Sequence, residues 1–300
     1  MGLESSLLQS LLSLAVDMVR LLVWLVLLLA ILAPLEKRWA LHPQKLFRRA
    51  FGTDLVYYFL SGLLPKLLLI VPISLMAAGI HRTVPLGWYS RVAELPLGIR
   101  FLAAIVVGDI GAYWGHRWSH EIPFLWRFHS VHHGAEDIDW LVNSHAHPVD
   151  MVFTRICGLF PLYLLGLIQP MSNGLDIVPV LFTLVVTVWG FFIHANIRWR
   201  LGWLETLVSS PAFHHWHHTN DDAESRNKNY SALLPWVDRC FGTLYLPGEA
   251  WPVKYGTDTA LPSSLVGQLF RPFVPEGTAE VGEGSMEPTL VERELTGRNG

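Results

Sequence analysis

Residues 177–193 read IVPVLFTLVVTVWGFFI and contain no charged residue. A helix of this length rises about 1.5 Å per residue and so nearly crosses the roughly 30 Å hydrocarbon core of a bilayer. Pro65 and Pro72 predict a kink in one of the other apolar segments. The sequence therefore predicts an all-α integral membrane protein with four to five transmembrane helices. The other candidate segments are residues 21–33, 55–80, 95–115 and 151–169.

The composition supports a membrane protein. Hydrophobic residues make up 51% of the 300 residues and charged residues only 16%, against about 25% in a typical soluble domain. The mean hydropathy is +0.35. A net charge of −3 provides no basic field for a phosphate backbone, and Cys157 and Cys240 are too few for a thiolate metal site or a disulfide framework. This composition excludes a disordered chain, a nucleic-acid-binding protein and a disulfide-stapled secreted module.

Basic residues set the expected orientation in the membrane. The loop at residues 34–53 carries five of them and should be cytoplasmic, because positive charge favours that side. With five crossing helices, residues 116–150 and 194–275 lie on the cytoplasmic side too. No small-residue cleavage site follows the first apolar segment, so we expect it to remain as a helix. The protein is expected in a bacterial cytoplasmic membrane or in the endoplasmic reticulum. The basic residues are Lys37, Arg38, Lys45, Arg48 and Arg49.

The chain divides into four regions by composition. Residues 1–108 hold the N-terminal transmembrane helices and the basic loop. Residues 109–250 are rich in histidine and form the expected catalytic domain, and residues 251–275 form a cytoplasmic extension. Residues 276–300 are rich in Gly and Glu and poor in aromatic residues, which is typical of a disordered acidic tail.

Twelve of the 14 histidines lie between residues 116 and 218, and most of them fall in three short strings. The strings HSVHH at 129–133 and HHWHH at 214–218 place imidazoles at i, i+3 and i+4, and HRWSH at 116–120 places them at i and i+4. These positions share one face of a helix, so each string can aim two or three rings at one point. A lone histidine is usually a hydrogen-bonded core residue. Three clusters together indicate metal binding instead, because a shared cation offsets the repulsion and lost hydration of so many rings.

The number of imidazoles favours two ions over one. A closed structural zinc site uses four ligands, and here eight or more are available. The zinc-peptidase pattern His-Glu-x-x-His and the paired Glu-x-x-His of ferritin-like proteins are both absent. An almost all-imidazole site at the edge of a bilayer favours a redox metal acting on a lipid, with iron first. The spacing alone leaves zinc and copper open.

These strings resemble the fatty acid hydroxylase/sterol desaturase superfamily. The resemblance covers about residues 109–247 and includes DIGAYWGHRWSHEIPFLWRFHSVHH, NSHAHP, HANIRW, SSPAFHHWHHTNDDAESRNKNY and WVDRCFGTLYLP. It implies a membrane-bound non-haem di-iron enzyme that uses O2 and two electrons to hydroxylate or desaturate a lipid. It also implies a cytoplasmic helical cap that holds the histidine-rich dimetal site.

The resemblance assigns metal ligands residue by residue. His215 falls at a spacer position, and His147 stays open between a ligand, a supporting residue and a loop residue. Asn229-Tyr230-Ser231 departs from the family's Asn-Tyr-Gly, which leaves the local turn in doubt. The expected ligands are His116, His120, His129, His132, His133, His145, His194, His214, His217 and His218.

Polar residues are expected to support these ligands. Asp109 lies seven residues before His116 on the same helical face, so we expect its carboxylate to accept a hydrogen bond from a ligand imidazole. The residues expected to support ligands or fix loops are Asp109, Asn143, Asn196, Asn229 and Asp238.

The electrons must come from another protein. His42-Pro43 continues as Gln44-Lys45, which differs from the fused-haem motif of some relatives, and no dinucleotide-binding glycine loop is present. A ferredoxin or a b-type cytochrome with its reductase is implied as donor, and the basic loop is a candidate surface for docking or for lipid headgroups. The expected substrate is a membrane lipid, namely a sterol, a fatty acyl chain or a related chain. Two other functions stay open: a membrane metal-binding or transport protein, and a zinc-dependent lipid hydrolase.

Overall fold

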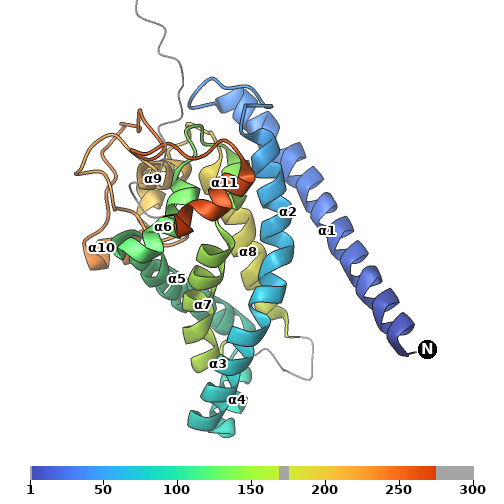
Figure 1. Cartoon of the computed structure of the whole chain (residues 1–300). Coiled ribbons are helices and arrows are strands. Elements are labelled where there is room, and N and C mark those ends of the chain that lie inside the picture. Colours follow the sequence, from blue (N-terminus) through green and yellow to red (C-terminus); the bar gives the residue numbers. More distant parts are fainter. Residues whose placement is uncertain (1, 169–175, 275–300) are drawn as a thin grey trace, which may run out of the picture.

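Most of the short helices lie together at one end of the long apolar helices. A computed structural model describes residues 2–168 and 176–274, so the expected tail at 276–300 lies outside the described residues. The long elements and α4 are α1 (Gly2–Trp39), α2 (Phe51–Leu68), α3 (Ile70–Thr83), α4 (Leu86–Ala93), α5 (Leu97–Glu121), α7 (Pro148–Leu164) and α8 (Ile177–His194). The short elements are α6 (Pro123–His133), η1 (Trp140–Ser144), η2 (Gly202–Thr206), α9 (Pro211–His217), α10 (Pro235–Phe241), α11 (Leu265–Phe270) and η3 (Arg271–Phe273). The short helices α6, α9, α10 and α11 gather at one end of α5, α7 and α8 (Figure 1); we call this end the cap.

The all-α membrane fold predicted from the sequence is confirmed. Within the described residues, Leu8–Trp39, α5 and α8 are long and apolar enough to cross a bilayer. The pair α2 and α3 forms a fourth candidate, bent by 43°. The break falls at Leu69, and Pro72 in the first turn of α3 has no N–H to donate to the Leu68 carbonyl four residues earlier, so the predicted kink is present.

The apolar segment expected at 151–169 differs from a full span. Its helix α7 has 17 residues and is therefore about 25 Å long, slightly short for the hydrocarbon core. It packs closely along α5, where a Cβ at Gly111 would come within 2.5 Å of the Cys157 carbonyl oxygen. Leu162 near the end of α7 packs with Val178 at the start of α8. The chain thus enters the cap at the end of α5, leaves it through α7 and comes back to it through α8.

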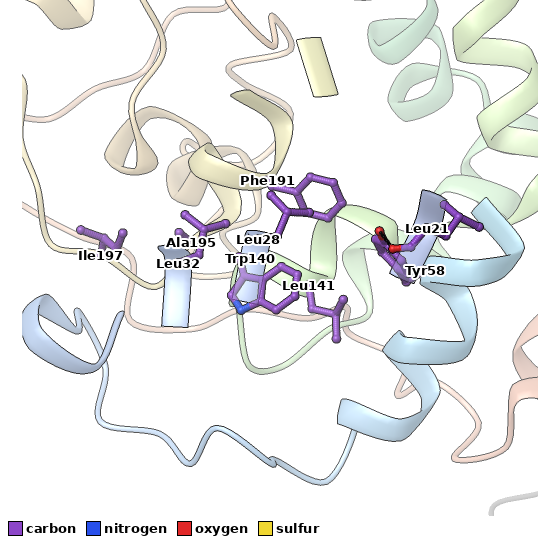
Figure 2. Packing of buried hydrophobic residues seen from close by; sticks show 9 residues of the cluster. All are labelled: Leu21, Leu28, Leu32, Tyr58, Trp140, Leu141, Phe191, Ala195 and Ile197. Carbon is purple, nitrogen blue, oxygen red and sulfur yellow. Dashed lines mark hydrogen bonds between the residues drawn. The ribbon is translucent and has the colours of Figure 1, made fainter. Parts of the chain in front are cut away.

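The first helix reaches the cap through one apolar stripe. Leu21 of α1 packs beside Tyr58 of α2, whereas Leu28 and Leu32 lie in the same buried cluster nearer Trp140 of η1 and Phe191 or Ala195 at the end of α8 (Figure 2). The spacing i, i+7, i+11 puts these leucines on one face of the helix. The remaining apolar side chains of α1 are largely exposed, as expected for a helix surrounded by lipid.

Candidate metal centre

Five histidines from three helices converge at the junction of the membrane helices and the cap. Their ligand nitrogens all lie within 4.8 Å of one another. α5 ends with two of them, α6 carries two and α9 carries one. We call this set the five-histidine group: His116, His120, His129, His133 and His217.

A second set lies beside the first. Its ligand nitrogens also fall within 4.8 Å of one another, and all its residues are buried. It draws on the last residue of α8 as well as on α6 and α9 with its C-cap. We call it the four-histidine group: His132, His194, His214 and His218.

The two groups divide each histidine triplet between them. His132 and His133 are neighbours in sequence but belong to different groups, and so do His217 and His218. Consecutive helical residues point about 100° apart, so adjacent rings diverge toward two centres. Each triplet therefore aims two of its rings at one centre, as expected, and its third ring at the other centre. α6 and α9 each supply both groups, which ties the two centres together.

Hydrogen bonds to the outer ring nitrogens orient the imidazoles. The Nδ1 atoms of His116, His132 and His217 donate to the carbonyls of Tyr230, His145 and Lys228 at 2.7–2.9 Å. His194 Nδ1 likewise donates to the Gly190 carbonyl at 2.7 Å. Donation through Nδ1 leaves the Nε2 lone pair free, and these lone pairs face inward.

The inward nitrogens are spaced as ligands of a common ion. The Nε2 atom of His129 lies 3.1 Å from those of His116 and His120, and His214 Nε2 lies 2.9 Å from His194 Nε2. Nitrogens that each lie about 2.1 Å from one ion are about 3.0 Å apart when they bind at right angles. Facing lone pairs without a proton repel each other, so a cation fits each group. Imidazole is a donor suited to iron, zinc and copper.

Burial keeps these rings neutral and ready to bind. For His132, His133, His214, His217 and His218, burial and then the neighbouring imidazoles hold the pKa well below 6.5. The groups differ in exposure: His116 and His120 at the edge of the five-histidine group are half-buried, whereas every member of the four-histidine group is buried.

The sequence did not predict that Asp150 supports the ring of His129. Asp150 accepts a hydrogen bond from His129 Nδ1 at 2.9 Å, and its other oxygen accepts from the Ser119 hydroxyl at 3.2 Å. It lies in the first turn of α7, where an acidic residue commonly stabilises a helix. For that reason nothing in the sequence connected Asp150 with His129.

Asp109 and Asp238 hold loops. The carboxylate of Asp109 accepts the backbone amides of Leu233 and Leu234 at 3.0 and 2.9 Å, instead of the imidazole that we expected. Seven residues of helix separate it from His116 by about 10 Å, which is too far for a hydrogen bond. Asp238 accepts the amide of Tyr230 at 2.7 Å, and thereby fixes the loop whose carbonyl orients His116.

The asparagines link segments around the centre. The side chain of Asn196 accepts from the His42 amide and donates to its carbonyl, at 2.9 and 2.7 Å. Asn143 lies so close to α8 that a Cβ on Gly190 would come within 2.7 Å of its Oδ1. Asn229 has a positive φ of 59° and its side chain bonds both backbone groups of Tyr245. Ser231, where the family often has Gly, is buried and its amide donates to Asp238.

Three nearby histidines lie outside both groups. His147 uses both nitrogens, since Nδ1 accepts the Val149 amide and Nε2 donates to the Leu269 carbonyl. His215 also uses both, with Tyr255 and Ala195. His145 was expected as a ligand, but its Nδ1 pairs with Asp54, and its buried Nε2 has no partner among the described residues.

Comparisons with known proteins show which proteins this chain is similar to. Residues 101–243 match the family model of fatty acid hydroxylases. Similar proteins include ornithine lipid hydroxylase OlsE of Rhizobium tropici, 30% identical over 67% of this chain and 59% of that protein. Human alkylglycerol monooxygenase is 31% identical over 57% of this chain and 33% of its own length. Methylsterol monooxygenase 2-2 of Arabidopsis thaliana is 26% identical over 64% of this chain and 67% of its own length.

The chain thus spans less than two thirds of the first two of these relatives. No solved structure matches it.

Proposed function

Because this chain carries a fatty acid hydroxylase domain at residues 101–243, we propose that it is a membrane-bound, non-haem di-iron oxygenase that hydroxylates or desaturates a lipid. The observation that carries the proposal is the pair of histidine groups at the membrane end of the cap. The five-histidine group holds one ion and the four-histidine group holds the other. Lipid oxidation is also what the names of the relatives describe, namely a lipid hydroxylase, an alkylglycerol monooxygenase and a methylsterol monooxygenase.

Bound iron supplies the activation of O2 and the removal of hydrogen from an unactivated C–H bond. The protein orients the imidazole rings and keeps water away from the metal site. Carbonyls and the Asp150 carboxylate hold the outer nitrogens, so the inner nitrogens keep their lone pairs. Burial excludes water from the four-histidine group.

The site lies where a lipid can reach it. His116 and His120 are at the cap end of α5, and His194 is the last residue of α8, so both groups border helices that can cross a bilayer. A sterol, a fatty acyl chain or a related chain can present one carbon from the membrane without entering water. The half-buried rings of His116 and His120 make the five-histidine group the more accessible side.

The two electrons come from a separate donor, a ferredoxin or a b-type cytochrome with its reductase. We place the cap on the cytoplasmic side, where such donors work. The exposed Lys37 and Arg38 in the last turn of α1, and Lys45 and Arg49 in the loop before α2, support this side through the positive-inside preference.

Comparative lipid mass spectrometry tests the proposal. A host that expresses the wild-type protein should contain a lipid altered by one added oxygen or by two lost hydrogens, only when O2 is present. His132→Ala removes a ring of the four-histidine group and should abolish the product. His81→Ala, an exposed histidine on α3, should leave it unchanged. Product formation without O2 would indicate a hydrolase, and metal uptake by vesicles without lipid oxidation would indicate a transporter.

A further inference from the structure

A buried cluster of charges lies next to the four-histidine group. The Arg48 guanidinium donates to both oxygens of Asp139 at 2.7 and 2.9 Å and pairs with Asp54 at 2.6 Å. The three side chains are 4%, 7% and 0% exposed. We call these residues the Arg48 cluster: Arg48, Asp54 and Asp139. They come from the loop before α2, from α2 itself and from the residue that caps η1.

A short chain of contacts connects this cluster with a candidate ligand. Asp54 also pairs with Nδ1 of His145, and the ring of Tyr57 stacks on His145 with centroids 4.5 Å apart. The backbone carbonyl of His145 accepts the hydrogen bond from Nδ1 of His132. The position of His145 therefore sets the orientation of the His132 ring.

Stability alone is a weak reason for such a cluster. Burying ions costs free energy that their mutual attraction often only just offsets, so a buried ion pair is poor evidence of a stabilising role. Two carboxylates also share one guanidinium here, which leaves negative charge in excess. Neutral imidazoles leave the charge of a bound cation uncompensated, so this excess is favourable beside the four-histidine group.

We propose that the Arg48 cluster positions His132 through His145 and so raises the affinity of the four-histidine group for its metal ion. The inference rests on the proposed function, because it requires that the group binds metal. Arg48, Asp54 and Asp139 are positioning residues in this account.

The test is metal binding to the purified full chain in detergent, with Asp54→Asn as the main variant. Asp54→Asn keeps the size of the side chain but weakens its hold on Arg48 and His145. We expect wild type to bind two Co2+ ions per chain. Asp54→Asn should bind the ion of the five-histidine group with wild-type affinity and the ion of the four-histidine group 10- to 100-fold more weakly. The visible Co2+ spectrum should lose the band of the site with fewer nitrogen ligands.

Two matched variants control for general damage. Asp17→Asn makes the same chemical change in the ion pairs of Asp17 with Lys66 and Arg20 on α1 and α2, and should bind both ions as wild type does. Asp150→Asn loosens His129 and should weaken the ion of the five-histidine group instead. If Asp54→Asn does not fold, Asp54→Glu keeps the charge and should recover most of the second ion's affinity.

The outcomes separate the two proposals. If wild type binds no transition metal, the proposed function fails. If wild type binds two ions and Asp54→Asn binds both with wild-type affinity and spectrum, the positioning role is overturned while the metal centre stands. Equal weakening of both ions in Asp54→Asn, or weakening in Asp17→Asn, would also overturn the positioning role.

Discussion

Neighbouring histidines on one helix contribute to different metal-binding groups. The spacing of the three histidine strings indicates which side chains gather, but a pattern on one helix does not say how neighbouring rings are divided. The division of His217 from His218 depends on the position of α9 between α5, α6 and α8, which is a tertiary property. Asp54 and Asp150 were missed for the same reason, since their partners lie 91 and 21 residues away in sequence.

The paired variants His217→Ala and His218→Ala test this division. Each should remove one of the two bound ions, because each deletes a ring from a different group. Metal content per chain and the Co2+ spectrum measure the loss, and the two variants should lose different bands. His215→Ala, in the same helix, should retain both ions. Loss of an ion from His215→Ala would contradict the assignment of ligands.

The neutral histidines also predict how stability depends on pH. Burial lowers the pKa of His215 to about 4. In the unfolded chain this ring takes up a proton below about pH 6.5, whereas in the folded protein it stays neutral down to about pH 4. The contribution of His215 to the free energy of unfolding of metal-free protein should be constant above pH 6.5 and fall between pH 6.5 and 4. The fall from His215 alone is about 3 kcal/mol.

Denaturation of metal-free protein in detergent at pH 7.5 and 5.5 measures this dependence, and His215→Gln should reduce it. An equal pH dependence in His215→Gln and in wild type would contradict a neutral, buried His215.

At the scale of elements, composition predicts where the apolar helices lie, but it does not predict which of them are long enough to span the membrane. α8 and the kinked pair α2 and α3 agree with the sequence. The segment at 151–169 is also largely apolar, but its helix ends at Leu164 and packs along α5. Apolarity cannot distinguish a side chain that faces lipid from one that faces another membrane helix, because both environments exclude water.

The close contact between α5 and α7 depends on Gly111. Gly111→Val should place Cβ within 2.5 Å of the Cys157 carbonyl and push the helices apart. We expect a loss of about 1–3 kcal/mol in the free energy of unfolding, measured by denaturation in detergent. Gly98→Ala on the same helix meets no atom within 4 Å and serves as the control. Equal stability of Gly111→Val and wild type would contradict the close packing.

At the scale of the whole molecule, the membrane helices and the cap build one site together. α5 and α8 end in candidate ligands, α1 packs against η1, and the loop before α2 supplies Arg48. The sequence predicted the cap and its contents because histidines cluster strongly. It treated Arg48 as one more surface charge, since the positive-inside pattern and a buried ion pair look alike in sequence.

The proposed sidedness predicts how the two cysteines react. Cys240 in the cap is exposed, whereas Cys157 lies half-buried in α7. A membrane-impermeant maleimide should label the protein in vesicles that expose the cytoplasmic face and not in vesicles of the opposite orientation. Cys240→Ser should abolish the labelling. Labelling only from the opposite face would place the cap outside the cytoplasm and contradict the proposed donor.

The central claim is that the two histidine groups hold one iron ion each. The most direct measurement is the iron content per chain of the full protein purified from an iron-replete host and determined by elemental mass spectrometry. The account predicts two iron ions per chain. One ion, zinc in place of iron, or no metal in a folded protein that still oxidises its lipid would contradict it.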